Sequence, residues 1–520
     1  MVAERSGTET RLVELLAVLS LATDLGVGRP LENELRVTVV AVRFGRTLHL
    51  DQEALRELLF VALLRWIGCT SHAHELALLF DDEIEAQRRA AWIDFAHPPE
   101  VLTDALRYAG AGRAPLRRLQ TVAQAVAGGA KIAAESYRAS CEVGAMFADR
   151  IGLAAGVQRA LAFVFERWDG KGWPKGIRGE QIPQSVRLTN VAQDAFNFYR
   201  LGGVGAATEV LRKRSGRAHD PALVSSFCAA AGDLMEGLDE RGLWNEVLAL
   251  EPAPVHLVPE ERLDAVLRAM GDFADLKAPF MLGHSPGVAE LAAASAERLG
   301  LPPEDIQAVR RAGWAHDLGR VGVPNGIWEK PGPLSDLEWE RVRMHPYLTE
   351  RALARCAALA PYAALAALHH ERLDGSGYHR GCRAPQIGMS ARVLAAADAY
   401  HAMTEERPYR PALDATAAKH RLREEVQAGR LDGWAADGVL GAAGHRVRRR
   451  QRDWPGGLST RQVEVLRFAV RGKSNREIAA HLHISERTVE HHLEHIYTKI
   501  GVSTRAAAAL FAAQNELLED

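Results

Sequence analysis

The stretch HDLGRVGVPNGIWEKPGPL, at residues 316–334, opens with a histidine directly followed by an aspartate and belongs to a longer series of such residues. The candidate ligands in this series are His284, His316, Asp317, His345, His369, His370 and Asp398. Imidazole nitrogens combined with carboxylate oxygens suit iron, manganese or zinc, whereas calcium and magnesium favour oxygen ligands alone. An aspartate beside a histidine can bridge two metals, which lie about 3.5–4 Å apart in sites that cleave phosphate esters. The series therefore predicts a two-metal hydrolytic centre with Asp317 as the bridge.

Each histidine taken singly has an ordinary alternative interpretation. The chain contains 20 histidines, several of which are expected to be solvated, and neighbouring histidines on a helix usually point in different directions. The candidate ligands come in order from several separate helical segments, and such an ordered set favours metal binding over coincidence. Cys69, His72 and His74 also stand close together in sequence, but they lack a fourth partner and are interpreted as incidental.

Several motifs around this stretch are similar to those of one known family. The segment at residues 316–334 is followed by MHP, HHERLDGSGY and ADAYHAMTEERPYR, and together they resemble the HD-GYP branch of HD-domain phosphohydrolases. The resemblance implies an all-helical domain that opens cyclic di-GMP with metal-activated water, and it assigns the metal-ligand role to the series named above. It also implies that Asp317 and Arg320 are catalytic. The residues facing the substrate would be Arg320, Tyr378, Arg407 and Arg410.

The chain departs from the family pattern at several positions. Arg320 stands where the family usually has lysine, and because a guanidinium stays charged it suits a phosphate clamp better than a proton donor. His379 replaces the proline of the GYP signature, and His401 stands where a second aspartate is common. Phe280 occupies the place of an acidic residue that some members use for a third metal. We therefore expect two divalent ions, with iron or manganese favoured and zinc as the alternative.

The composition indicates a large globular protein that is nearly all helix. The length of 520 residues exceeds the usual domain size of about 100–200, so two or three domains are expected. Hydrophobic residues make up 47% of the chain, and leucine and alanine recur at helical spacing. The five cysteines lack CxxC spacing and no apolar run reaches about 18 residues, which predicts a cytoplasmic protein without a membrane span. With a formal net charge of −2, attraction to nucleic acid requires a local basic patch.

The sequence contains an internal repeat. FERWDGKGWPKGIRGEQIPQSVR, at residues 165–187, aligns without a gap with HERLDGSGYHRGCRAPQIGMSAR, at residues 370–392, which predicts a duplication of the helical domain. Reading the ligand positions across gives the replacements Asn33 for His284, Arg65 and Trp66 for His316 and Asp317, Ser140 for His345, Val164 and Phe165 for His369 and His370, and Gln193 for Asp398. The first copy is therefore expected to be free of metal. A structural or dimerisation role is favoured for it, with ligand sensing as the alternative.

The last sixty residues carry a separate pattern. Ser474 followed three residues later by Glu477 is a capping box that predicts a short helix over residues 475–483. A turn at Ile484 precedes a longer helix that Ser485 caps and that extends to about Lys499. Short helix, turn and longer helix form a helix-turn-helix arrangement.

This C-terminal segment resembles the LuxR-type DNA-binding domain, through LSTRQVEVL, GKSNREIA, LHISERTVEHH and KIGVSTR. The resemblance implies four helices, with residues 485–499 in the major groove of double-stranded DNA and the last helix forming a dimer contact. The residues expected to face DNA are Arg476, Ser485, Arg487, Thr488, His491, His492 and Lys499. Glu490 stands where a lysine is usual, and the arginines of residues 447–452 are either an added phosphate-binding arm or a solvated linker.

These patterns divide the chain into four predicted parts. They are a degenerate HD-GYP-like domain at residues 1–250, a ligand-complete one at 251–445, a basic linker at 446–457 and the helix-turn-helix domain at 458–520. The predicted function is a homodimeric transcriptional regulator whose second domain hydrolyses a cyclic dinucleotide or another phosphate ester. One alternative is a nucleotide-sensing transcription factor with little or no turnover. A weaker alternative makes the enzyme primary and the last domain an interaction module.

Overall fold

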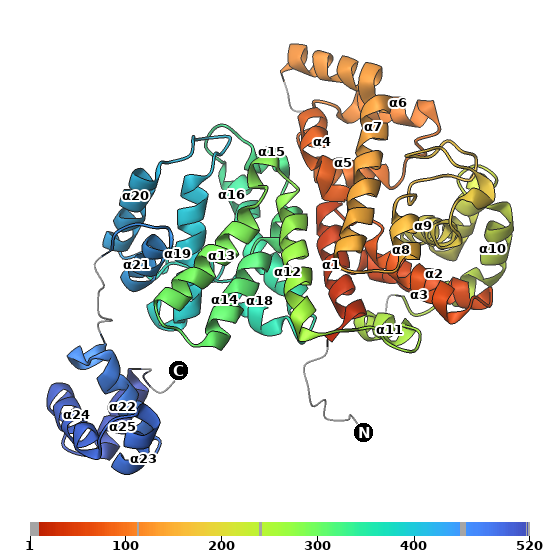
Figure 1. Cartoon of the computed structure of the whole chain (residues 1–520). Helices are drawn as coiled ribbons and strands as arrows, with labels where there is room; N and C mark the ends of the chain where they lie inside the picture. The colour runs from red at the N-terminus through yellow and green to blue at the C-terminus, as the bar shows by residue number, and fades with distance from the viewer. Residues whose placement is uncertain (1–9, 112–113, 239–241, 448–453, 516, 518–520) are drawn as a thin grey trace.

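The computed structural model describes residues 10–111, 114–238, 242–447, 454–515 and 517, and these parts of the chain are almost entirely helical (Figure 1). The prediction of an all-α protein is thus confirmed. Within the described residues, the one sheet pairs β1 (Thr10–Arg11) with β2 (Leu257–Val258) in antiparallel register, Thr10 opposite Val258. None of the described helices combines the length and the apolar character needed to cross a membrane.

The first half consists of helices only, apart from β1. In chain order they are α1 (Leu12–Gly26), α2 (Asn33–Thr47), α3 (Gln52–Leu64), η1 (Cys69–His72), α4 (Ala73–Phe80), α5 (Glu83–Ala90), α6 (Pro98–Tyr108), α7 (Pro115–Arg150), α8 (Ala155–Leu161), η2 (Gly179–Gln181), α9 (Gln184–Arg214), α10 (Pro221–Met235) and α11 (Leu243–Leu250). The centre of this half is α2, which packs against both α3 and α9.

The second half repeats that arrangement. Its elements are α12 (Glu260–Asp275), η3 (Pro279–Met281), α13 (His284–Arg298), α14 (Pro303–Ala315), η4 (Leu318–Gly322), α15 (Asn325–Trp328), α16 (Asp336–Arg343), α17 (His345–Leu353), α18 (Ala360–Ala366), η5 (Ala384–Gln386), α19 (Met389–Thr404), α20 (Ala415–Gln427) and α21 (Gly433–Ala442). Here α13 packs against α14 and α19, as α2 packs against α3 and α9.

The repeated turn makes the same hydrogen bonds in both halves. Glu166 Oε1 accepts from the backbone N–H of Lys175 at 2.7 Å, and Glu371 Oε1 accepts from that of Arg380 at 2.7 Å. Arg187 donates to the carbonyl of Ile182 and to Asp220, as Arg392 donates to the carbonyl of Ile387 and to Asp432. These matching contacts support the predicted duplication, because they tie the same turn to the helix that follows it.

The two halves share one hydrophobic core. Leu16 on α1 and Val42 on α2 belong to the same buried cluster as Val288 on α13 and Ala396 on α19. Helix α1 of the first half packs against η4 and α17 of the second half. The predicted domain boundary between residues 250 and 251 therefore separates two halves that are packed together, with the linking segment at residues 251–263 between them.

A buried ion pair fastens the first half to the second. Lys277 Nζ donates to Glu83 Oε1 at 2.6 Å, and both side chains are almost completely buried. The same carboxylate accepts from the backbone N–H of Asn325 at 3.0 Å, and the Asn325 amide donates to the carbonyl of Lys277 at 2.6 Å. Glu83 on α5 thus holds the start of α15, the helix that ends at Trp328.

The C-terminal domain has a core of its own, built on α22 (Thr460–Val470), α23 (Asn475–Leu482), α24 (Glu486–Ile500) and α25 (Arg505–Gln514), which follow η6 (Pro455–Gly457). Ser474 and Glu477 form the predicted capping box, and Ser485 Oγ accepts from the backbone N–H of Thr488 at 3.1 Å. His483 ends α23 with φ 51°, which makes the turn tight. Residues 448–453, which include most of the predicted arginine arm, lie outside the described residues.

Replacing Glu83 with alanine is expected to destabilise the protein by about 3–5 kcal/mol, because it leaves the Lys277 ammonium buried without its carboxylate. Urea unfolding followed by tryptophan fluorescence measures the effect. The matched control is Glu85→Ala on the same helix, whose half-exposed ion pair with Arg88 is worth less than about 1 kcal/mol. Equal losses in the two variants would show that the buried pair does not hold the halves together.

Candidate metal centre

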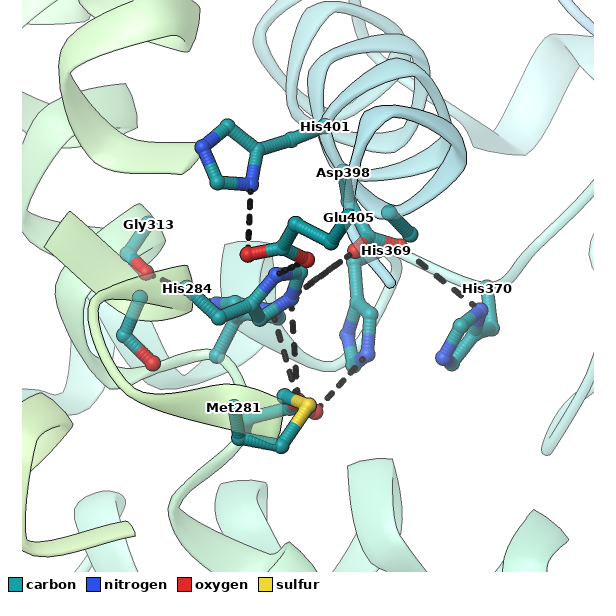
Figure 2. Close-up of polar contacts among 12 residues, drawn as sticks. Met281, His284, Gly313, His369, His370, Asp398, His401 and Glu405 are labelled. Carbon is teal, nitrogen blue, oxygen red and sulfur yellow. Dashed lines mark hydrogen bonds and ion pairs between the residues drawn. The ribbon is translucent and has the colours of Figure 1, made fainter. Parts of the chain in front are cut away.

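The predicted ligands come together at one buried place between the helices of the second half. His284 begins α13, His316 and Asp317 follow α14, His345 begins α17, His369 and His370 follow α18, and Asp398 lies on α19. Figure 2 shows His284, His369, His370 and Asp398 of this set. His370 is half-buried and the others are buried. Ligand atoms within 4.8 Å of one another define the groups His345–His369–His370, His284–His316–Asp398 and His316–Asp317–His369.

Close contacts between backbones bring these helices into position. A Cβ on Gly319 would lie 2.2 Å from the carbonyl oxygen of His345 and 2.4 Å from the backbone nitrogen of Thr349. Glycine at this position therefore allows η4 to lie directly on α17. The Gly319 N–H also donates to Thr349 Oγ1 at 2.8 Å, and the Thr349 hydroxyl donates to the carbonyl of His316 at 3.0 Å. These contacts place His345 beside the His316–Asp317 pair.

Asp317 lies between two groups of histidines. Its Oδ1 is 3.3 Å from His345 Nε2 and 3.6 Å from His369 Nε2. Its Oδ2 is 3.7 Å from His316 Nε2 and 4.0 Å from His284 Nε2. Each oxygen of one carboxylate thus faces its own set of imidazoles, which is the arrangement that a bridging ligand requires.

Asp398 completes the two groups from the opposite side. Its Oδ1 is 3.4 Å from His284 Nε2 and 3.9 Å from His316 Nε2, whereas its Oδ2 is 3.9 Å from His370 Nδ1. One group therefore contains His284, His316 and both carboxylates. The other contains His345, His369, His370 and both carboxylates.

The hydrogen bonds of the imidazoles fit a metal centre. His316, His345 and His369 each place Nδ1 2.6–2.7 Å from a backbone carbonyl, which fixes the proton on Nδ1 and leaves Nε2 with a free lone pair. The Nε2 atoms of His345 and His369 nevertheless face each other at 3.2 Å, and His316 Nε2 has no hydrogen-bond partner. Lone pairs directed at one another in a buried site are stable when a cation lies between them.

The pKa shifts of three histidines and two aspartates agree with that interpretation, whereas, against the effect of burial, hydrogen bonds to Asp398 and Glu405 raise the pKa of His284 to about 10. Burial lowers the pKa of His316 to about 4, and it also lowers those of His345 and His370, so these rings are neutral at physiological pH. Burial alone would raise the pKa of Asp317 and Asp398, but the surrounding imidazoles hold both well below the usual range. Neutral imidazoles with ionised carboxylates are the ligand forms that divalent metals bind.

Sequence reasoning missed two residues behind His284. Glu405 Oε2 is 2.8 Å from His284 Nδ1, and Glu405 Oε1 is 3.2 Å from His401 Nδ1 (Figure 2). Burial opposes ionisation of Glu405, but its hydrogen bonds to these histidines lower its pKa to about 2. A carboxylate that accepts from Nδ1 directs Nε2 of the same ring towards the ligand groups. The available signal was the position of Glu405 two residues before Arg407, which begins the predicted RPYR segment.

The predicted substrate residues lie at different places around this centre. Arg320 is close to it: Nη1 is 3.3 Å from Asp317 Oδ2, and the guanidinium lies 3.7 Å from the centroid of the Trp328 ring. Tyr378 packs its ring 4.7 Å from that of His370. Arg407 is buried and donates to Glu405 Oε2 at 2.6 Å. Arg410 donates to backbone carbonyls at the end of α19, among them that of Met403 at 3.2 Å. Its guanidinium thus caps the C-terminus of this helix.

In the first half, the replaced positions form a different environment. Trp66 Nε1 donates to Gln193 Oε1 at 3.0 Å, and Arg65 Nη1 donates to the carbonyl of Val164 at 2.8 Å. Ser140 Oγ lies 3.0 Å from His72 Nδ1. Asn33 Oδ1 accepts from Arg200 at 3.3 Å. No group of metal-ligating side chains is found at these positions within the described residues.

The predicted DNA-facing residues occupy the exposed side of α23, the turn and α24. Arg476, Arg487, Thr488 and His491 are exposed, and His492 is half-buried. Ser485 caps α24 with its hydroxyl. Lys499 directs its ammonium inwards, with Nζ donating to the carbonyl of Gly457 at 2.6 Å and to Gln462 Oε1 at 2.9 Å. Its donors thus tie α24 to the start of α22, and its predicted contact with DNA stays untested.

Comparison with known proteins gives two family matches. Residues 268–434 match the HD domain, and residues 457–512 match the bacterial regulatory proteins of the luxR family. The 3'3'-cGAMP-specific phosphodiesterase 3 of Vibrio cholerae is 30% identical over 419 residues, which cover 80% of this chain and 91% of that protein. A cyclic di-GMP phosphodiesterase of Pseudomonas aeruginosa is 39% identical over 142 residues, which cover 27% of this chain and 34% of that protein.

The fold is also similar to a solved structure. The crystal structure of a cyclic GMP-AMP specific phosphodiesterase of V. cholerae aligns with a TM-score of 0.58 and 26% sequence identity. The alignment covers 85% of this chain and 99% of that one, and therefore extends over both helical halves.

The bridging position of Asp317 predicts a loss of metal on its removal. The purified full-length protein is expected to contain about two metal ions per chain, and Asp317→Ala less than one, because each group of histidines loses a carboxylate oxygen. Metal analysis by inductively coupled plasma mass spectrometry gives both values. His420→Ala, an exposed histidine on α20, is the control and should keep the full content. Unchanged metal content in Asp317→Ala would exclude the bridge.

Proposed function

Because the chain belongs to the HD-GYP branch of the HD-domain phosphohydrolases and carries a LuxR-type helix-turn-helix domain, we propose that it hydrolyses a cyclic dinucleotide and regulates transcription. The observation that carries the enzymatic part is the position of Asp317 between two groups of imidazoles. The observation that carries the regulatory part is the exposure of Arg476, Arg487 and Thr488 on α23 and α24.

We propose that the substrate is 3'3'-cGAMP, with cyclic di-GMP as the second choice. The relative that aligns over both halves is described as specific for 3'3'-cGAMP. Relatives described as acting on cyclic di-GMP match shorter segments of the chain. Both compounds are cyclic phosphodiesters, and both therefore require the same kind of centre.

We propose that two divalent ions, iron or manganese, are held by the two groups around Asp317 and Asp398. When bound, such ions polarise a phosphoryl oxygen and activate water. The protein's own contribution is to fix the ligands through Nδ1 contacts with backbone carbonyls and Glu405, and to exclude bulk water by burial. The ionised Asp317 and Asp398 offset the positive charge that the site takes up.

Arg320 is proposed to stabilise negative charge on the phosphate. Burial lowers its pKa, but Asp317 opposes that shift, and a guanidinium stays protonated under ordinary conditions. The stack on Trp328 fixes its plane, and the buried Glu83 fixes the helix that carries Trp328. Arg320 is thus a prearranged cation beside the ligand groups, which suits charge stabilisation and not proton donation.

Arg320→Met is expected to lower kcat for 3'3'-cGAMP by about 10²–10³-fold, the usual effect of losing one prearranged electrostatic donor. Arg320→Lys should recover part of the loss, because it keeps the charge without the planar fork. Product formation followed by liquid chromatography supplies the rates, and exposed Arg343→Met serves as control. Wild-type protein with full metal content that cleaves neither cyclic dinucleotide would contradict the proposed activity.

The alternative function is a nucleotide sensor with slow turnover or none, whose output is DNA binding alone. Arg320 in place of a lysine and His379 in place of the family's proline favour it, since both change the substrate side of the centre. A ligand shifts DNA binding when it binds the competent and incompetent states with different affinity. A DNA titration with and without cyclic dinucleotide that gives identical affinities would count against this alternative.

Arg487→Ala is expected to weaken binding to DNA from the protein's own promoter region and to reduce the salt dependence by about one unit of log–log slope. Arg487 is exposed near the start of α24, where a phosphate or base edge is within reach. Fluorescence anisotropy at several salt concentrations measures both quantities. Lys131→Ala, an exposed cation on α7, is the control. Equal binding by both variants would favour a protein-interaction role for this domain.

We also propose that the chain forms a homodimer through its last helix. Leu510 on α25 is 60% exposed, although it is a large apolar side chain. An exposed leucine on this helix offers apolar area that a second copy would bury.

A further inference from the structure

We propose that the metal-free cleft of the first half is a binding site for a phosphate monoester, in which arginine side chains stand where the second half holds metal ions. The ligand class is a mononucleotide or a linear dinucleotide with a terminal phosphate. The proposal concerns the first half alone and does not depend on catalysis in the second.

The two clefts are built on the same backbone. Asp275 accepts from the backbone N–H of Ser285 at 2.8 Å in the second half, and Asp24 accepts from that of Glu34 at 3.2 Å in the first. On this shared frame, three positions of the first half carry arginine where the second half has a histidine, a glutamate and a phenylalanine. Arg65 stands in the place of His316, Arg200 in the place of Glu405 and Arg29 in the place of Phe280.

One contact shows the change directly. In the second half, Glu405 lies 2.8 Å from His284 Nδ1. In the first, Arg200 donates to Asn33 Oδ1 at 3.3 Å, with each partner at the equivalent position. The second half thus has a carboxylate next to the candidate ligand His284, whereas the first half has a guanidinium next to the neutral amide of Asn33. The cavity of the first half is lined by four arginines and by Asp94, Glu166 and Asp194, and this excess of one positive side chain favours an anionic ligand.

Arg65 forms no ion pair within the part of the chain that the structure describes, although the charges of Glu34 and Asp194 oppose the lowering of its pKa by burial. Arg29 forms an ion pair with Glu34, Arg167 with Asp94 at 2.9 Å, and Arg214 with Asp194 at 2.6 Å. Among the described residues, Arg65 has no carboxylate within ion-pair distance. It donates to the carbonyl of Val164 and to Asn190 Oδ1, and its buried Nε has no hydrogen-bond partner.

A half-buried cation without a counterion is costly, and an anionic ligand removes that cost. Burial lowers the pKa of Arg65 to about 10, so the side chain is still charged at neutral pH. A phosphate monoester carries close to two negative charges, whereas each phosphodiester of a cyclic dinucleotide carries one. The unbalanced arginine therefore favours a monoester over the cyclic compound.

Aromatic rings surround the arginine. Trp66, Tyr137, Phe165 and Trp173 line the same cavity as Arg29 and Arg65. Tyr137 and Trp173 are stacked, with ring centroids 4.9 Å apart, and the Arg29 guanidinium lies 4.3 Å from the Trp66 centroid. Aromatic and guanidinium planes are the surfaces on which nucleobases stack.

The size of the cavity limits what enters it. Its volume is about 130 Å³, below the roughly 300–1,000 Å³ of pockets that enclose a whole small-molecule ligand. It accommodates a phosphate group and the nearest part of its ester, and a base would contact the aromatic rim. A cyclic dinucleotide, which has no terminal phosphate, does not fit this description.

The test uses the full chain with Asp317→Ala, so that the metal centre neither binds nor hydrolyses the probe. Isothermal titration with GMP should show binding, and guanosine, which lacks the phosphate, should bind at least about tenfold more weakly. Adding Arg65→Met should lower the affinity for GMP by about tenfold or more, which is the effect of losing one charge-assisted contact. Adding Arg159→Met, which replaces an exposed arginine on α8, should leave the affinity for GMP unchanged.

Arg65→Lys gives a second variant that keeps the charge, and GMP affinity between those of arginine and methionine is expected from it. Circular dichroism checks that each variant is folded. Equal GMP affinity in Arg65→Met and its parent would overturn the proposal, as would the absence of GMP binding to the Asp317→Ala parent. Tighter binding of a cyclic dinucleotide than of GMP to that parent would overturn the assignment to a monoester.

Discussion

The central constraint on the second half is the carboxylate of Asp317, whose two oxygens face different groups of imidazoles. Oδ1 lies 3.3 Å from His345 Nε2 and Oδ2 lies 3.7 Å from His316 Nε2. This geometry requires α14 to end at Ala315, so that the His316–Asp317 pair leaves the helix. It also requires the close approach at Gly319, which brings the first residue of α17 beside the pair. The ends of α14 and α17 thus both meet at the Asp317 carboxylate.

The two halves have similar helical arrangements, but the side chains in their clefts differ in charge. In the second half, three histidines whose pKa is lowered by burial lie beside the ionised Asp317 and Asp398, which is a ligand set suited to divalent metals. In the first, Arg65 supplies a fixed positive charge and aromatic rings occupy much of the remaining space. The halves are also mechanically joined, because Glu83 of the first half holds the helix whose Trp328 supports Arg320. The contact between Glu83 and this helix physically connects the two clefts.

The sequence was sufficient for features that depend on local patterns. The ordered ligands, the Ser474–Glu477 capping box and the repeated turn all follow from residue types at short spacing, and the structure places each as expected. Periodicity does not report which helices touch, so it gave no sign of the Glu83–Lys277 pair or of the core shared across residues 251–263. Nor does it report that Arg410 donates to backbone carbonyls, or that Lys499 donates to a carbonyl and a glutamine. Their contacts with substrate and with DNA stay predictions. Long cationic side chains have many reachable acceptors, and only the folded geometry selects among them.

The most direct test of a bridged pair of metals is anomalous X-ray scattering from crystals of the full-length protein, with data collected at the absorption edges of iron, manganese and zinc. Two anomalous peaks about 3.5–4 Å apart, on either side of Asp317, and no peak near Arg65 are the expected result. A single peak, or peaks placed away from Asp317, would contradict the prediction that the Asp317 carboxylate bridges two metals.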